Sequence, residues 1–190
     1  ICQKSSKIKM SNYTLGIIGG GQLGSMLAIA AKKLGIKIII FCDDLEAPAQ
    51  NFCDEFVGAK YDNKEKINEF VNKVDIVTYE FENIPYETLN DINKLKPVLP
   101  KPSVNRLIQH RLAEKDFVNK LNIRTTRYVS VENQSDIDVL EDFLPGIIKT
   151  TTLGYDGKGQ HPVSSAEEIK NLKLDLSRAV SYTHLTLPTI

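Results

Sequence analysis

The sequence predicts an α/β fold built on a parallel sheet with helices on both faces. Between residues 15 and 99, short apolar runs alternate with segments whose apolar residues recur at helical spacing, which is typical of such sheets. The first run, Leu15 to Ile18, leads directly into Gly19, Gly21 and Gly24. This G-x-G-x-x-G spacing is typical of the strand, tight turn and helix of a nucleotide-binding unit.

The elements of this first half follow from apolar periodicity. After the glycine turn, a helix is indicated by apolar residues at helical spacing: Met26, Leu27, Ile29, Ala30 and Leu34. Strands are predicted at 37–41, 56–58, 75–79 and 98–99, and a loop with one helical turn at 44–54. A helix is predicted at 64–73, and Pro85 suits the first turn of another, in which Leu89 and Ile92 face inward.

In the second half the predicted strands and helices no longer alternate regularly, and three prolines at 97, 100 and 102 precede it. We place the domain boundary here, giving domains at 13–103 and 104–180. Helices are predicted at 103–110, 112–121, 135–143 and 166–172, and strands at 128–131, 146–149 and 161–163. A second glycine-rich loop, 153–160, would then be the tip of a hairpin.

Composition excludes several classes of protein. The 190 residues are 42% hydrophobic with a formal net charge of zero, so a general attraction to nucleic acid or to an anionic membrane is not indicated. The apolar runs are too short to span a bilayer. The three cysteines lack metal-like spacing, which favours thiols in a reducing cytoplasm. The three histidines show no ligand or triad spacing.

Both ends of the chain differ from the rest. The first methionine is Met10, and residues 1–12 are expected to be a disordered or non-native lead. The composition changes abruptly at Ser181, so residues 181–190 are interpreted as a non-native tail and are left out of the fold.

The first glycine loop is a candidate anion site. Gly21 would let the backbone approach a phosphate, and the helix N-terminus offers unpaired N–H groups. Asp43 lies near the end of the second strand, where a dinucleotide fold binds a ribose hydroxyl. Glu80 and Glu82 follow a later strand, so these groups should share one crevice. The alternatives are a tight turn that serves packing and solvated loop carboxylates.

The second glycine loop is the stronger signal. Its glycines free backbone N–H groups to wrap an anion, and Lys149 ends an apolar strand, where an ammonium is costly without an anionic partner. The alternative is a flexible hairpin with surface lysines. Arg111 and Lys115, four residues apart, share one helix face, which is usually a solvated face.

Three motifs in this order, GGGQLG (19–24), TYEFENIP (78–85) and KTTTLGYDGKGQ (149–160), resemble the 5-(carboxyamino)imidazole ribonucleotide synthase family. These are ATP-grasp ligases of purine biosynthesis, and the resemblance extends from about residue 13 to about residue 176. It implies a Rossmann-like preATP-grasp domain followed by the first α+β subdomain of an ATP-grasp domain. The implied reaction uses ATP and Mg²⁺ to carboxylate 5-aminoimidazole ribonucleotide with bicarbonate, through carboxyphosphate.

The resemblance also implies roles for individual residues. ATP-binding residues would be Arg111, Lys149, Gly154, Tyr155, Asp156, Gly157, Lys158, Gly159 and Gln160. The ribonucleotide would be held by Gly21, Gln22, Leu23 and Glu80, of which the last three match positions in the related formate-dependent glycinamide ribonucleotide transformylase. The Mg²⁺ ligands and other catalytic residues would follow the end of this chain, so a fragment inactive alone is expected. A cytoplasmic homodimer is implied for the full-length protein.

Other functions remain open at this stage. One is another ATP-grasp purine enzyme, such as the transformylase. A second is an NAD(P)-binding oxidoreductase module with Asp43 on the ribose, and a third is a nucleotide-binding regulatory module. The oxidoreductase alternative gives no role to Lys149 or to the second glycine loop.

Overall fold

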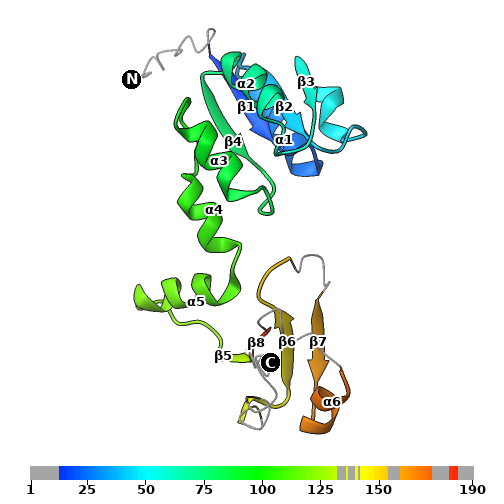
Figure 1. Ribbon diagram of the computed structural model, residues 1–190, viewed down its shortest axis with the longest axis vertical. Coiled ribbons are helices and arrows are strands. Elements are labelled where there is room, and N and C mark those ends of the chain that lie inside the picture. The colour runs from blue at the N-terminus through cyan, green and yellow to red at the C-terminus, as the bar shows by residue number, and fades with distance from the viewer. Residues whose placement is uncertain are drawn as a thin grey trace, which may run out of the picture. The chain divides into compact units, whose positions relative to one another are not determined.

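The computed structural model describes residues 13–131, 136, 140, 142–153, 159–172 and 180–183. The chain divides into two compact units, Ile1–Arg106 and Leu107–Ile190, shown in Figure 1. This division and the predicted domain boundary after residue 103 both fall within helix α4 (Pro102–Ile108). No helix among the residues described is both long and apolar enough to cross a bilayer.

The sheet of the first unit is parallel throughout, as predicted. Its strands are β1 (Thr14–Ile18), β2 (Lys37–Cys42), β3 (Glu55–Gly58) and β4 (Ile76–Tyr79), in the order β3-β2-β1-β4. The predicted strand at 98–99 is only an isolated bridge between Val98 and Val77. Pro97 and Pro100 flank residues 98–99 in the sequence. A proline has no N–H with which to extend the ladder of hydrogen bonds between strands.

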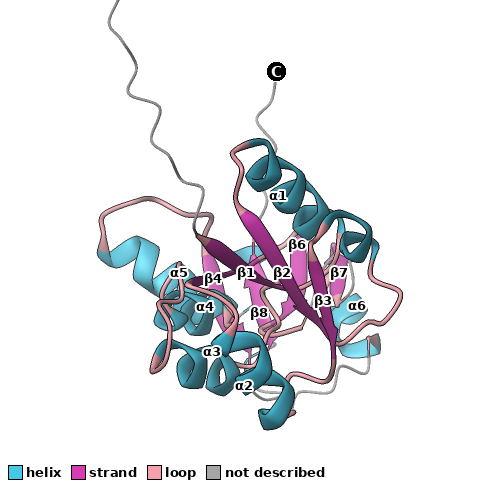
Figure 2. Ribbon diagram, turned by 90° about the horizontal axis from the view of Figure 1, so that it is seen from above, coloured by secondary structure: helices cyan, strands magenta, loops and turns pink. Residues whose placement is uncertain are grey.

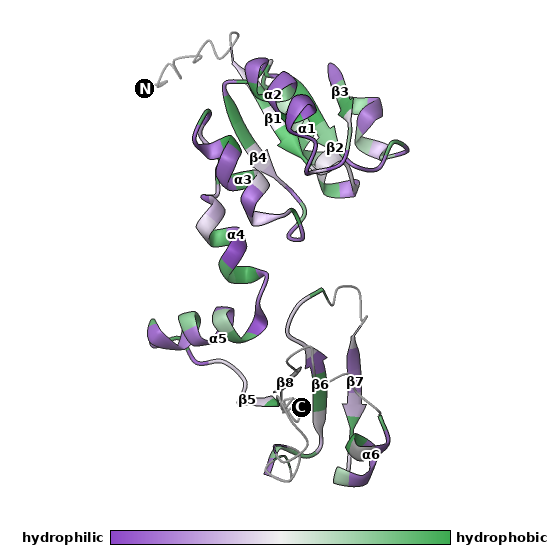
Figure 3. Ribbon diagram, viewed as in Figure 1, coloured by the Kyte–Doolittle hydropathy of each residue, from purple (hydrophilic) through white to green (hydrophobic). Residues whose placement is uncertain are grey.

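The helices of the first unit cover both faces of this sheet (Figure 2). Helix α1 (Gln22–Lys33) and the 3₁₀ turn η1 (Pro48–Phe52) pack on one face, where Ile17, Ile38 and Ile40 are buried. Helices α2 (Lys64–Asn72) and α3 (Tyr86–Asn93) pack on the other. That second core contains Ile18, Ile39, Phe41, Phe70, Leu89 and Ile92. Apolar residues on both faces explain why the two central strands, β1 and β2, are mostly hydrophobic runs (Figure 3).

Helix α1 was correctly predicted. However, its buried face is not the face that carries the large apolar residues. Gly24, Ser25, Ala28 and Ala31 are its buried residues. Leu23, Met26, Leu27, Ile29 and Leu34 are all exposed. A Cβ on Gly24 would lie 3.0 Å from the carbonyl oxygen of Gly19, so small residues allow α1 to pack closely on the sheet.

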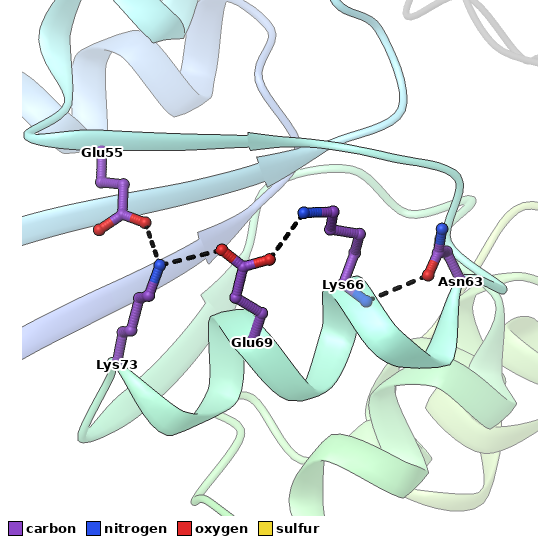
Figure 4. Close-up of polar contacts among 5 residues, drawn as sticks. All are labelled: Glu55, Asn63, Lys66, Glu69 and Lys73. Atoms are coloured by element: carbon purple, nitrogen blue, oxygen red, sulfur yellow. Dashed lines mark hydrogen bonds and ion pairs between the residues drawn. The ribbon is translucent and has the colours of Figure 1, made fainter.

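Helix α2 shows how local chemistry fixes one element of this unit (Figure 4). The Asn63 side chain caps the helix by accepting a hydrogen bond from the Lys66 N–H at 3.0 Å. Near the other end, Lys73 contacts Glu69 at 3.1 Å and Glu55 of β3 at 2.5 Å. These ion pairs are exposed and stabilise little, so the cap should contribute more than any one of them.

Replacing Asn63 with alanine is expected to lower the free energy of unfolding by about 1 kcal/mol, because a first-turn N–H loses its acceptor. Urea denaturation followed by circular dichroism measures the change. Asn68→Ala is the matched control: it makes the same substitution at an exposed position inside α2, where alanine is the better helix former. Equal destabilisation by both variants would contradict the assigned cap.

The second unit contains an antiparallel sheet and helices, in agreement with the predicted α+β subdomain. Its strands are β5 (Tyr128–Val131), β6 (Gly146–Thr150), β7 (Gln160–Val163) and β8 (Val180–Thr183), in the order β5-β8-β6-β7. The same unit contains helices α5 (Arg111–Lys120) and α6 (Ala166–Asn171). The core contains Val131, Leu140, Ile148, Val163 and Ile169.

Ser181–Thr183, which the sequence analysis leaves out of the fold, form most of β8 and pair with both β5 and β6. Most of the helix predicted at 135–143 lies outside the described residues, as do 184–190 and the lead at 1–12.

Candidate functional site

The first glycine loop joins β1 to α1 and already holds an anion. Gly21 donates its N–H to Glu80 Oε1 at 2.9 Å. Gly19 has a φ of +102°, and a Cβ there would lie 2.7 Å from the same oxygen. The glycines therefore make room for a carboxylate of the protein's own chain, and a phosphate bound to the Gly21 N–H would have to displace it.

A small crevice of about 160 Å³ opens beside this loop. We call it the loop crevice; it is lined by Gly19, Gly20, Gly21, Cys42, Asp43, Asp44, Ala47, Pro48, Tyr61, Glu80 and Phe81. The prediction that the glycine turn, Asp43 and the turn after β4 share one crevice is confirmed for Asp43 and Glu80. Glu82, by contrast, is exposed and is not part of the lining.

The charge of the loop crevice is acidic. Its lining includes three carboxylates, on Asp43, Asp44 and Glu80, and no lysine or arginine. A phosphate would be repelled by these groups, whereas hydroxyl and amine groups would find acceptors. The lining therefore suits the sugar hydroxyls or the amine of a ligand.

Tyr61 and Cys42 are members of the lining to which the sequence analysis gave no role. The Tyr61 hydroxyl donates to Cys42 Sγ at 3.9 Å. Burial, and then the proximity of Cys42 and Asp43, raise the pKa of Tyr61, so the hydroxyl stays protonated at neutral pH. Tyr61 follows β3 at its carboxyl end, and the rule that ligands bind beyond the carboxyl ends of parallel strands could have found it.

Gln22 and Leu23, also predicted as site residues, open helix α1. Both are exposed and neither lines the loop crevice. The N-cap, Gly21, offers no side-chain acceptor to the first turn of this helix, where backbone N–H groups lack intrahelical partners. The predicted contacts of Gln22 and Leu23 with a ligand would therefore be made outside the loop crevice.

The second unit brings cationic side chains together. Arg111, the first residue of α5, donates its backbone N–H to the Thr151 carbonyl at 2.9 Å, and its guanidinium donates to the Thr150 carbonyl. These bonds fasten the start of α5 to the end of β6, where Lys149 lies. Lys115 lies one turn further along α5, with Nζ 5.3 Å from the centre of the Tyr128 ring.

The second glycine loop leaves the same strand. Lys149 is in register with Gln160 of β7, and Thr150 donates its N–H to the Gly159 carbonyl at 3.0 Å. Gly159 has a φ of +64°, and a Cβ there would lie 2.7 Å from Thr150 Oγ1, so a glycine is required where the loop closes. The other predicted ATP-binding residues of this loop, 154–158, lie outside the described residues.

Comparisons with known proteins match both units. A model of the ribonucleotide synthetase preATP-grasp domain matches residues 12–109, and a model of the ATP-grasp domain matches residues 116–181. The bifunctional purine synthesis protein purC/E of Dictyostelium discoideum is 40% identical over 161 residues, which are 84% of this chain and 16% of that protein.

Two bacterial relatives are similar over most of this chain. The N5-carboxyaminoimidazole ribonucleotide synthase of Staphylococcus haemolyticus is 37% identical over 88% of this chain and 45% of its own. A crystal structure of N5-carboxyaminoimidazole synthetase from Staphylococcus aureus, complexed with ADP, has a TM-score of 0.84 at 32% identity, covering 92% of this chain and 48% of that one. The chain thus spans about half the length of the synthases it matches.

Proposed function

We propose that this chain, which belongs to the ribonucleotide synthetase preATP-grasp family, serves the ATP-dependent carboxylation of 5-aminoimidazole ribonucleotide. In this reaction ATP phosphorylates bicarbonate to carboxyphosphate. The substrate's amine then attacks the carboxyl carbon, a C–N bond forms, and the C–O bond to phosphate breaks. The products are the carbamate, 5-(carboxyamino)imidazole ribonucleotide, with ADP and inorganic phosphate.

One observation supports this assignment most directly: the two units differ in the charge of their candidate sites. The first unit has the acidic loop crevice, with Glu80 on its glycine loop. The second places Arg111 and Lys149 at the end of β6. Polyphosphate requires cations and backbone donors, so ATP is assigned to the second unit. The hydroxyl and amine groups of the ribonucleotide are assigned to the first.

The site residues follow this division. In the proposal Gly21, Gln22, Leu23 and Glu80 hold the ribonucleotide. ATP is bound by Arg111 and Lys149 together with residues 154–160, the phosphate-covering loop. Bicarbonate is the third substrate, and a cytoplasmic homodimer completes the proposal.

The resemblance implies Mg²⁺ as well as ATP. Among the described residues, no three histidine, cysteine, aspartate or glutamate side chains gather in a way that could hold a metal ion. In nucleotide sites Mg²⁺ is usually held by one or two carboxylates together with the phosphates, so Mg²⁺ stays part of the proposal with ATP, and no step of the reaction is derived through it.

The oxidoreductase alternative is less well supported. A dinucleotide fold places its pyrophosphate on the N–H groups of the first glycine loop, but here the Gly21 N–H bonds Glu80.

The test is an assay of the full-length protein with ATP and bicarbonate, with and without 5-aminoimidazole ribonucleotide. Phosphate release that depends on the ribonucleotide, with formation of the carbamate, is expected. Absence of ribonucleotide-dependent turnover would overturn the proposal. Turnover with formate and glycinamide ribonucleotide instead would assign the chain to the transformylase reaction.

A further inference from the structure

The side chain of Lys115 is held in place rather than free in solvent. Its Nζ lies 5.3 Å from the centre of the Tyr128 ring, a cation–π distance. The Tyr128 hydroxyl donates to Asp116 at 2.5 Å and accepts from Asn119 Nδ2 at 3.1 Å. Because these two partners lie on α5, they fix the ring against the same helix that carries Lys115.

Lys115 lies one turn after Arg111, whose guanidinium donates to the Thr150 carbonyl, next to Lys149 on β6. Burial, and then repulsion by Lys149, lower the pKa of Lys115, which agrees with the bonds that fasten the start of α5 to the end of β6. Glu114, the next residue back on α5, acts in the opposite direction but more weakly. The described groups that act on Lys115 include Glu114 of its own helix, Lys149 of β6 and the Tyr128 ring of β5.

The charges of Lys115 and Lys149 have the same sign and repel each other. The ion pairs found among the described residues involve neither Lys115 nor Lys149. Two partly buried like charges destabilise each other, and an anion between them would convert that repulsion into attraction. Arg111, one turn before Lys115 and fastened to the strand next to Lys149, adds a third positive charge.

We propose that Lys115 is a phosphate-binding residue of the nucleotide site, acting beside Arg111 and Lys149. The inference rests on the proposed function, because it takes ATP as the anion of the second unit. A single phosphate does not need three cations, whereas a di- or triphosphate presents adjacent charges along its length. Lys115 therefore contributes to binding of ADP and ATP and not to recognition of the nucleoside.

The experiment compares nucleotide affinity by titration calorimetry in the full-length protein and in its Lys115→Gln variant. The Kd for ADP and for ATP should rise by roughly tenfold or more, as expected for loss of a charge-assisted contact. The Kd for adenosine should not change. Lys115→Arg should keep most of the affinity, because it keeps the charge. Lys120→Gln, on the same helix and exposed, is the matched control and should bind like the wild type.

The outcomes separate this inference from the proposed function. Wild-type protein that binds neither ADP nor ATP would overturn the proposed function. Wild-type binding that weakens in Lys149→Ala but not in Lys115→Gln would overturn only the role of Lys115. Equal loss of adenosine and ATP binding in Lys115→Gln would also overturn it, because a purely structural role for the Tyr128 contact predicts that result. Thermal melting of each variant shows whether it is folded. If Lys115→Gln is unfolded, the affinity of the folded Lys115→Arg variant for ADP and ATP decides whether the charge at this position is needed.

Discussion

Replacing Glu80 with alanine in the full-length protein is expected to raise the KM for 5-aminoimidazole ribonucleotide by about 100-fold, because hydrogen bonds to a charged group contribute about 1.5–3 kcal/mol each. The Glu80 carboxylate accepts the Gly21 N–H at 2.9 Å and lines the loop crevice. Its loss removes the acceptor for the substrate and also leaves the glycine turn without its anion. Steady-state kinetics with the ribonucleotide varied at saturating ATP measures the effect.

The control for this prediction is Glu82→Ala, two residues along the same turn. Glu82 is exposed and is not part of the crevice lining, so the KM for the ribonucleotide should stay near that of the wild type. The KM for ATP should be unchanged in both variants, since ATP is assigned to the second unit. Glu80→Gln keeps an oxygen for the Gly21 N–H but loses the charge, and an intermediate KM is expected. An unchanged KM in Glu80→Ala would exclude Glu80 from the substrate site.

Replacing Phe70 with alanine is expected to lower the free energy of unfolding by about 4 kcal/mol, the range for a fully buried phenylalanine. Phe70 is 0% exposed, and its ring centre lies 5.6 Å from that of Phe41 of β2. The ring also fills the space beside Gly16 of β1, where a Cβ would lie 2.5 Å from Phe70 Cζ. Urea denaturation monitored by circular dichroism measures the loss.

Two further variants test whether the effect comes from this packing. Phe52→Ala makes the same truncation at a residue that is 39% exposed and should cost much less. Gly16→Val should destabilise the wild type, because the added side chain meets the Phe70 ring, but destabilise the Phe70→Ala background less. Strictly additive effects of the two substitutions would contradict the direct contact, since residues in contact are expected to couple.

The order of elements in the first unit could be predicted from local patterns. Strands β1 and β2 have consecutive buried residues that face both layers of helices, so they appear as continuous apolar runs. Ile67, Phe70 and Val71 mark the buried face of α2 at helical spacing. The same reasoning found α1 but not its orientation, because the side that packs on the sheet is made of small residues and apolar periodicity weighs large ones.

The candidate sites were only partly predictable. The sequence placed Glu80 at the carboxyl end of a strand, but not on the N–H of Gly21, which is 59 residues away along the chain. Arg111 and Lys115 could be assigned to one helix face, but a solvated face was the simpler interpretation. Lys149 is on β6, and no spacing rule relates it to a residue on α5.

By itself, the sequence determined the parallel α/β sheet, the glycine turns, and the family motifs that indicate an ATP-dependent ligase. These depend on periodicity and on conformations that glycine allows, which are properties of neighbouring residues. Only the tertiary structure decided which anion the first glycine loop holds and that Arg111 of α5 is bonded to the strand that carries Lys149. Both are contacts between residues far apart in the chain, and charge–charge interactions depend on distance in space, which the sequence does not specify.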